Sequence, residues 1–494
     1  MQTVWVFGDQ LNRSIGALGR ADPHTHRVLL VESAALLGSR RWHRQRAHLV
    51  IASMRRFANE LRAAGFEVDH RRAASLLDGF HAHLDERSPD GVVVTEPNSW
   101  DLRRRVEQLD VEIVRSNQFL CHYDEFAGWA ASRKQVKLED FYRWRRTATG
   151  YLMDGDEPVT GRWNYDAENR EPPPAAGTWP QPVTSRLDEL DRAVLADLPD
   201  GCFGDEPTGV WPTSRRAALT RLRHFVDAVL PTFGPHEDAM TTRSWHLAHS
   251  VLSAPLNLGL LLPGEVCDAV QDAYDAGRVP IASAEGFVRQ VLGWREYVWG
   301  VYWLWMPEYR SENHLGANRP LPPVFTGNAA TEMACLADCL AGVEARAYNH
   351  HIQRLMVLGN LGLLAGVDPW AMTRWMWASF VDGAEWVMLP NVIGMALHAD
   401  GGRMATKPYA AGGNYIDTMS DYCRDCRFDR KQRTGGDACP FTTLYWDFLA
   451  RHADRFGKNP RMARQVSAMR RLGDLDVVRE RAAEVLDRLD RGAL

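Results

Sequence analysis

Four of the eight cysteines constrain this chain most, because they have the spacing of ligands to one metal centre. The residues between them number 87, 2 and 12, and a proline directly follows the last one. They are Cys335, Cys423, Cys426 and Cys439. Four thiolates can hold one [4Fe–4S] cluster, in which a Cys-Pro pair recurs, but they also suit tetrahedral zinc. Reduced cysteines are also often just small buried apolar residues, so three interpretations stay open.

The other cysteines show no comparable pattern, and they do not resemble a disulfide framework. They are Cys121, Cys202, Cys267 and Cys339. Cys339 follows Cys335 by four residues, about one helical turn, so it could replace that ligand or pack beside it. Thiols with metal-ligand spacing, together with a first segment that resembles a strand and not a signal sequence, predict a cytoplasmic location.

Length and composition predict a globular chain of two or three domains. The 494 residues are 45% hydrophobic and 24% charged, and no stretch approaches an uninterrupted membrane span. The net charge is −5, so a surface for nucleic acid would have to be a local basic patch. The arginine-rich segments 143–146 and 458–471 are candidates, although solvated helix faces have the same composition.

Short β-like runs alternate with amphipathic helical stretches over the first part of the chain. The runs lie at 3–7, 28–31, 67–69, 92–95 and 111–114, and the helical stretches include 42–64 and 99–108. This alternation predicts an α/β domain with a Rossmann-like parallel sheet over residues 1–132. The first strand runs into Gly8, Asp9 and Gln10, at the edge where open α/β sheets bind ligands. No GxGxxG motif follows, so an ordinary dinucleotide site is not supported.

A polar stretch rich in glycine and proline, residues 133–185, predicts an interdomain linker. Its segment 162–166 is more aromatic than a passive tether requires. Residues 186–494 then predict a large all-helical domain. Helical patterns lie at 213–229, 241–253, 283–305, 344–364, 369–380, 441–451 and 460–471.

Tryptophans are concentrated in two parts of this helical domain. They are Trp294, Trp299, Trp303 and Trp305, followed by Trp370, Trp375, Trp377 and Trp386. Large aromatic side chains most often fill cores. Beside a redox cluster, however, they indicate a protein that moves electrons and holds a large planar cofactor such as a flavin.

Several segments resemble the iron–sulfur bacterial cryptochromes and photolyases, the prokaryotic (6-4) photolyase group. The matching segments are GWREYVWGVYW (293–303), YNHHIQRLMVLGNLGLL (348–364), EWVMLPNVIGMALHADGG (385–402), KPYAAGGNYI (407–416) and CRDC (423–426). The likeness extends from VFGDQLN near the first residue to NPRM near the last, and so covers essentially the whole chain.

This resemblance implies the photolyase/cryptochrome fold, with an α/β antenna domain, a helical FAD-binding domain and a [4Fe–4S] cluster, and it favours iron–sulfur over zinc. It also implies an activity: light-driven electron transfer from reduced FAD to pyrimidine–pyrimidone (6-4) photoproducts in UV-damaged DNA. The damaged bases would have to be flipped out of the stack to reach a buried flavin.

The resemblance implies four catalytic residues. His351 is the expected general acid, because imidazole titrates near neutral pH and cyclobutane-dimer photolyases usually have Asn at this position. His350 lies about 100° around the same predicted helix, so we expect it to have a supporting role. Tyr409 matches a tyrosine of the lesion pocket, and Asn391 matches the residue that faces flavin N5.

The expected FAD contacts come mainly from the segment 237–259, with further contacts from the WRE motif. They are His249, Ser250, Leu252, Ser253, Asn257, Arg295 and Glu296. Ser and Asn near a helix start are equally common as helix caps, and Arg and Glu on a helix often form ordinary surface pairs.

Only part of the family's electron-transfer route has matching residues in this chain. Trp375 matches the tryptophan next to the flavin. Met376 stands where a tyrosine can occur, and an expected aromatic residue is missing around Gly327. We therefore expect Trp377 or Trp386 to substitute.

For the antenna, the resemblance implies 6,7-dimethyl-8-ribityllumazine in the α/β domain. The expected contacts are Gly8, Asp9, Gln10, Glu32 and His43. Asp166 and Asn169 match a family motif in the linker, where they would shape the lesion entrance or bridge the domains.

Two other functions share these cofactors. A photosensory cryptochrome would signal blue light without repair, and a structural iron–sulfur DNA-binding protein would hold a vestigial flavin. Fold and cofactors alone do not separate repair from signalling. We expect a monomer that acts on damaged DNA and does not enter a membrane.

Overall fold

The short apolar runs near the start of the chain pair as a five-stranded parallel sheet in the order β3-β2-β1-β4-β5. The strands are β1 (Gln2–Val6), β2 (His26–Ser33), β3 (Glu67–Ala73), β4 (Val92–Thr95) and β5 (Glu112–Val114). The helices around them are α1 (Ala34–Gly38), α2 (Arg44–Ala63), α3 (Leu76–Arg87), α4 (Trp100–Val106) and α7 (Glu189–Asp197). The computed structural model describes all 494 residues, and it confirms the predicted α/β domain.

Alternation of side chains along β1 gives the sheet two apolar faces. Val4 and Val6 belong to a core that continues into the helical domain, whereas Trp5 points to the opposite face, where its ring stacks on Phe80 at 4.6 Å. This period of two is the pattern of a strand buried on both sides. Because Val288, from the helical domain, belongs to the same core as Val4, the two domains pack on each other as one body.

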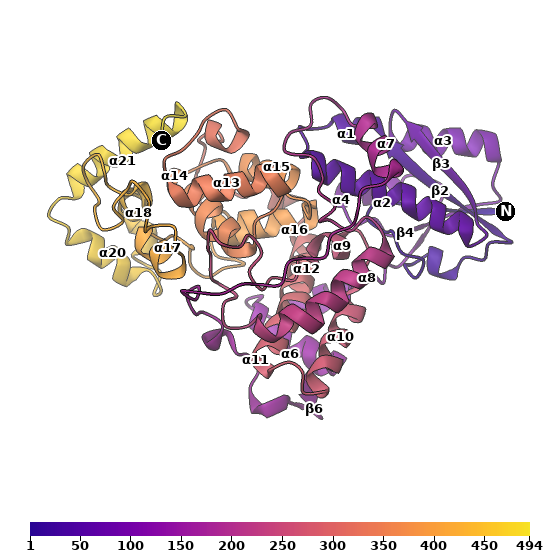
Figure 1. The fold of residues 1–494 in the computed structure, drawn as a ribbon, viewed down its shortest axis with the longest axis horizontal. Coiled ribbons are helices and arrows are strands. Elements are labelled where there is room, and N and C mark those ends of the chain that lie inside the picture. Colours follow the sequence, from indigo (N-terminus) through magenta and orange to yellow (C-terminus); the bar gives the residue numbers. More distant parts are fainter.

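The rest of the chain is almost entirely helical, and its last helices lie at the opposite end of the molecule from the sheet (Figure 1). The α-helices are α5 (Tyr123–Ala131), α6 (Leu138–Thr149), α8 (Arg215–His224), α9 (Ser253–Asn257), α10 (Pro263–Asp275), α11 (Ile281–Val288), α12 (Glu296–Trp305), α13 (Ala334–Arg346), α14 (Asn360–Ala365), α15 (Pro369–Ser379), α16 (Glu385–Leu389), α17 (Gly413–Met419), α18 (Pro440–Arg451), α19 (Ala453–Phe456), α20 (Ala463–Arg470) and α21 (Leu475–Asp490). None of the helices is long and apolar enough to cross a membrane.

Four segments are wound as π-helix, a form that occurs often at functional sites. They are η4 (Phe225–Val229), η6 (Arg289–Arg295), η9 (Gln353–Gly359) and η10 (Pro390–Ala396). The short 3-10 turns and strands are η1 (Leu18–Arg20), β6 (Met153–Asp154), β7 (Glu157–Pro158), η2 (Val159–Gly161), η3 (Asp166–Glu168), η5 (Leu230–Thr232), η7 (Glu308–Ser311) and η8 (Pro323–Thr326).

Two predicted helices differ from the structure. Residues 241–252 form no regular helix, and only the five residues of α9 follow them. The predicted helix 344–364 is interrupted, because Ala347 adopts a left-handed φ of 52° and ends α13. Helical structure resumes at His351, so His350 lies before the helix and the argument from a 100° helical offset was wrong.

The segment predicted as a linker, 133–185, contains the regular helix α6, which packs against η6 of the helical domain. Within the same segment, the Asn169 side chain is 2% exposed and lies 3.3 Å from the backbone oxygen of Ala282. This part of the chain therefore contributes to the helical core as well as connecting the domains.

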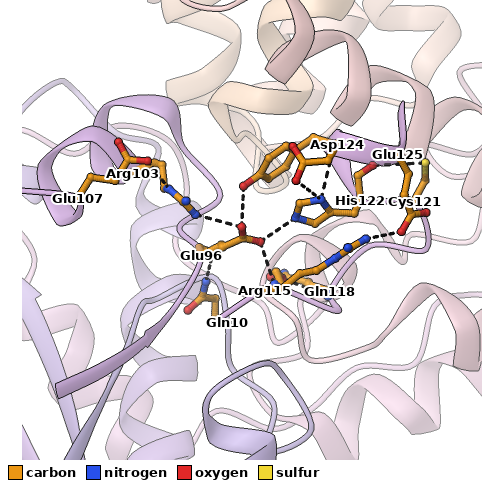
Figure 2. A network of polar contacts seen from close by, with 12 residues as sticks. Gln10, Glu96, Arg103, Glu107, Arg115, Gln118, Cys121, His122, Asp124 and Glu125 are labelled. Atoms are coloured by element: carbon orange, nitrogen blue, oxygen red, sulfur yellow. Dashed lines mark hydrogen bonds and ion pairs between the residues drawn. The ribbon is translucent and has the colours of Figure 1, made fainter. Parts of the chain in front are cut away.

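A buried carboxylate, Glu96, joins the end of β4 to the chain that leaves the sheet (Figure 2). It accepts hydrogen bonds from His122 Nε2 at 2.9 Å, Tyr123 OH at 2.6 Å and Ser116 N at 2.9 Å. Burial alone would raise the pKa of Glu96, but these hydrogen bonds lower it to about 2. The carboxylate thus stays ionised and holds the exit from the sheet in one conformation.

Two helical glycines give a matched test of this packing. At Gly300, in α12, an added Cβ would lie 2.2 Å from the Phe126 ring, whereas at exposed Gly128, in α5, it would meet nothing within 4 Å. Gly300→Ala should therefore destabilise the fold by about 1–3 kcal/mol through overpacking. Gly128→Ala should be neutral or stabilising, since Ala favours the helix. Calorimetric unfolding temperatures check this, and equal temperatures for the two variants would contradict the described packing.

Candidate functional site

Three histidines from two separate segments meet in one cluster. The rings of His249 and His350 stack with centroids 4.6 Å apart, and His351 lies edge-on to His249 at 5.4 Å. His350 is 1% exposed, whereas the side chain of His351 is 49% exposed. The backbone turn at Ala347 and the restart of the helix at His351 bring these rings together. The structure therefore unites three of the predicted site residues.

The three imidazoles differ in protonation. Burial lowers the pKa of His350 and of His249 well below the ordinary value, which keeps both rings neutral. Burial also acts to lower the pKa of His351, but the carboxylate of Asp238, whose Oδ1 lies 3.2 Å from His351 Nε2, outweighs it and raises that pKa. His351 is therefore the member of the cluster suited to hold and release a proton near neutral pH.

A second carboxyl group beside this cluster was not singled out from the sequence. Glu237 is 5% exposed, and its Oε1 accepts a hydrogen bond from Gln290 Nε2 at 2.6 Å. Burial raises the pKa of Glu237 to about 7, although the charges of His351 and Arg289 act to lower it. Glu237 and Asp238 lie in the segment taken for FAD contacts, and only burial distinguishes them from ordinary surface acids.

A buried ion pair organises the predicted FAD segment. Arg354, from η9, donates to both carboxylate oxygens of Asp382, at 2.9 and 3.1 Å. The same carboxylate accepts from Ser253 Oγ at 2.7 Å, and the Asp382 backbone oxygen accepts from Asn257 Nδ2 at 2.8 Å. The sequence analysis missed Arg354 and Asp382. Arg354 is the one charged residue of η9, and that was the signal that could have identified the pair.

The chain between these contacts has an unusual backbone. Leu247 and Val251 have φ values of 44° and 49°, a conformation that is strained for non-glycine residues and occurs mainly at functional sites. Ser250 Oγ accepts from the backbone N–H of Leu252 at 3.3 Å, and the Leu252 side chain is buried. This irregular loop exposes backbone groups that a regular helix would have used internally.

Asn391 lies on η10, next to the WRE motif. Its Oδ1 accepts from Trp294 Nε1 at 2.9 Å, and its Nδ2 donates to the backbone oxygen of Val387 at 2.7 Å. Tyr409 is half-buried, and burial raises the pKa of its hydroxyl. The structure thus surrounds Asn391 with protein partners and leaves Tyr409 partly exposed.

Arg295 and Glu296 form a buried pair, with Nη1 of the arginine 2.8 Å from Oε1 of the glutamate. Glu296 also accepts from the backbone N–H of Cys121 at 2.8 Å. The Arg295 guanidinium lies over the rings of Phe119 and Trp386, at 4.2 and 5.2 Å. Its Nε and Nη2 atoms are buried without a partner, so one edge of this guanidinium is free to donate hydrogen bonds to a ligand.

The predicted electron route has no tryptophan contact beyond its first member. Trp375 donates from Nε1 to the backbone oxygen of Phe325, and its ring neighbours are Phe325 and Phe380. Trp386 instead contacts Trp299 at 5.6 Å. Trp377 contacts Trp42. The two expected substitutes therefore belong to other aromatic groups of the molecule.

The four cysteines with metal-ligand spacing line one cavity. Two come from the turn 423–426, Cys335 lies on α13, and Cys439 precedes α18. Its other lining residues are mainly apolar: Met333, Gly413, Ile416, Tyr422, Phe428, Pro440 and Phe441. At Gly413 an added Cβ would lie 3.0 Å from Cys439 Sγ. Cys339 is fully buried and does not line this cavity.

The lining of the cavity tests which metal centre fits. Four thiols that line one mainly apolar cavity could hold either a tetrahedral zinc ion or a [4Fe–4S] cluster. Burial raises the pKa of the Cys423 thiol to about 12, so binding of any metal would displace protons.

The predicted antenna residues lie near the carboxyl ends of the strands, but they are not all free. Gln10 donates from Nε2 to the backbone oxygen of Glu96 at 2.8 Å, as Figure 2 shows. Glu32 pairs with both Arg55 nitrogens at 2.8 Å. His43 caps α2 and lies 3.0 Å from the backbone oxygen of Glu344.

Asp9, beside Gly8, is half-buried at the end of the first strand. Burial raises the pKa of its carboxyl to about 6, although a hydrogen bond from Asn98 acts to lower it. Of the two acidic side chains predicted to contact an antenna, Glu32 has an ion-pair partner and Asp9 has none.

Comparison with known proteins decides the family. This chain is 41% identical to the (6-4) photolyase of Agrobacterium fabrum over 508 residues, which cover 99% of this chain and 100% of that protein. The chain belongs to the photolyase and cryptochrome family. Residues 4–204 of this photolyase-family protein also match the family described as deoxyribodipyrimidine photo-lyase-related protein.

Two solved structures show that the fold is that of photolyases and cryptochromes. A bacterial class III photolyase from Agrobacterium tumefaciens aligns over 99% of this chain and 98% of its own, with a TM-score of 0.55 and 16% identity. A cryptochrome from Synechocystis aligns over 99% of both chains, with a TM-score of 0.57 and 14% identity. The predicted fold class is therefore confirmed.

The Asp238 carboxylate should control the titration of His351 in this photolyase-family protein. In Asp238→Asn the negative charge is gone, so the pKa of His351 should fall and the ring should lose its proton at lower pH. Nitrogen NMR of histidine-labelled protein over a pH series measures this. The control is Asp227→Asn, which removes an exposed carboxylate that pairs with Arg278. A His351 titration that is the same in both variants would refute the assignment.

Proposed function

We propose that this protein is a light-dependent photolyase that reverses pyrimidine–pyrimidone (6-4) photoproducts in DNA. The observation that carries the proposal is the 41% identity, over the full length of both chains, to a protein named (6-4) photolyase. The site supports it, since a partly exposed histidine paired with a carboxylate is suited to deliver a proton to a substrate from outside.

The proposed cofactor is FAD, held by the irregular segment 249–257 and by the Arg354–Asp382 pair. Buried polar atoms without partners support this position, since such atoms usually have a ligand or water. They include Nε and Nη2 of Arg295. When bound, the flavin would supply the electron that light excitation releases. Asn391 and Trp375 remain the proposed contacts at its ring.

The proposed role of His351 is to protonate the lesion as the electron arrives. The (6-4) photoproduct has moved a hydroxyl between two bases, so its reversal needs proton transfer as well as an electron. Asp238 keeps the ring protonated and orients Nε2, which leaves the other nitrogen to face the lesion. His350, neutral and buried behind it, would exclude water, and Tyr409 would form one wall of the lesion pocket.

The proposed metal centre is a [4Fe–4S] cluster on the four cavity-lining cysteines. The convergence of four thiols on one mainly apolar cavity supports it. Because the ligands come from positions nearly 90 residues apart, the cluster would mainly fasten the C-terminal helices to α13. We also propose 6,7-dimethyl-8-ribityllumazine as the antenna, at Asp9 and the adjoining strand ends.

The proposed partner is UV-damaged DNA, bound by one monomer in the cytoplasm. The exposed large apolar side chains are Met1, Leu36, Val183 and Val477, and their dispersion along the chain supports a monomer. All eight cysteines are free thiols, which supports a reducing compartment.

Cysteine substitutions test the metal centre. Cys423→Ala should reduce iron and acid-labile sulfide from four of each per chain to near zero, together with the absorbance near 400 nm, because one ligand is lost. Cys339→Ala should keep both, since that thiol lies outside the cavity. If the anaerobically purified wild-type protein contains zinc in place of iron, the cluster assignment is wrong.

Repair of a defined lesion tests the function. Photoreduced protein under blue light should restore an oligonucleotide that contains one (6-4) photoproduct and leave a cyclobutane dimer unchanged. His351→Ala should lose repair by at least a hundredfold while it retains FAD, because only the proton donor is removed. Absence of repair by wild-type protein with reduced flavin bound would favour a photoreceptor, and full repair by His351→Ala would exclude that proton donor.

A further inference from the structure

We propose that His249, His350 and His351 together bind one transition-metal ion of the zinc or copper(II) class, and that this ion blocks the mouth of the lesion pocket. The metal site is distinct from the cysteine cavity, which uses other residues. Its existence does not depend on the proposed function, whereas its inhibitory effect does.

The three imidazoles are close enough to share an ion. One ligand atom from each ring lies within 4.8 Å of the other two. Zinc–nitrogen bonds of about 2.0–2.1 Å would bring such atoms to about 3.4 Å, so a contraction of about 1.4 Å at most is needed. His351 can supply the part that involves its own nitrogen by side-chain rotation, because it is half exposed and begins its helix.

The buried members of the cluster lack partners. His350 Nδ1 and Nε2 and His249 Nε2 are buried without a hydrogen bond. An unpaired buried polar atom is costly, and a bound cation would remove that cost at each nitrogen that coordinates it.

Two carboxyl groups beside the three histidines could help to bind a cation. Asp238, 3.2 Å from His351 Nε2, offers a carboxylate that either orients the ring or takes a fourth position on the ion. Glu237 adds a second acidic group nearby. Three imidazoles favour zinc, copper or nickel over magnesium and calcium, which prefer oxygen ligands.

A metal ion bound at the three histidines would change the proposed repair reaction. A metal ion uses the nitrogen lone pair of His351 and therefore prevents that nitrogen from carrying a proton. It also adds positive charge and bulk where the damaged bases would enter. We therefore expect micromolar zinc to inhibit repair reversibly, with recovery on chelation, while millimolar magnesium does not compete for the site.

Electron paramagnetic resonance tests binding without reference to repair. One equivalent of copper(II) added to holoprotein with oxidised flavin and cluster should give a spectrum split by several equivalent nitrogens, and zinc should displace the copper. His249→Ala and His350→Ala should each weaken zinc binding by at least tenfold. His81→Ala, which removes an exposed histidine on α3, is the matched control and should bind as the wild type does.

The outcomes separate the two proposals. A copper spectrum without nitrogen splitting, or zinc affinity unchanged in the cluster variants, overturns the metal site whatever the repair assay gives. If a buried-histidine variant does not fold, His351→Ala provides the same test, because its side chain is half exposed. Absence of repair by metal-free wild-type protein would contradict the proposed function, but it would not affect the result of the metal-binding experiment.

Discussion

The ion pair between Arg354 and Asp382 is the interaction around which the site is built. It is largely shielded from water, with the side chains of Arg354 and Asp382 17% and 8% exposed. Arg354 Nε also donates to the backbone oxygen of Asn349 at 2.7 Å, which holds the chain in the conformation that leads into His350 and His351. Removing one partner of such a pair leaves an uncompensated charge and costs about 3–5 kcal/mol. The pair and its hydrogen bonds therefore hold together three segments that are far apart in the sequence, those around Ser253, Arg354 and Asp382.

The second constraint is the convergence of distant cysteines. Ordering the 87 residues between Cys335 and Cys423 costs chain entropy, which rises only slowly with loop length. The proposed metal centre would bond to both sides of that interval, would offset this entropy and would hold the short α17 and the turn 423–426 in place. The photochemical pocket and the proposed cluster thus lie in one helical body, but different interactions hold them.

Much of this could be predicted from the sequence. The apolar side chains on both faces of β1 and β2 predict the parallel sheet, since strands that are buried on both faces are typical of parallel sheets covered by helices. The cysteine spacing and the adjacent residues His350 and His351 could be read directly from the sequence. The Arg354–Asp382 pair and Glu237 were not identified, because an ionisable residue shows its role only through burial. The helix over 344–364 was wrong because Ala347, a strong helix former, is left-handed under tertiary contacts.

By itself, the sequence determined the fold class, the family and the set of residues able to do chemistry, because periodicity, ligand spacing and motif matches depend on residue identity. Only the tertiary structure decided which of those residues meet. It brought His249 to His350 across about 100 residues, gave His351 a carboxylate partner, and left Cys339 outside the cavity of the other thiols. Protonation, ligation and exclusion of water depend on distances of a few ångströms, and these arise when separate segments pack together.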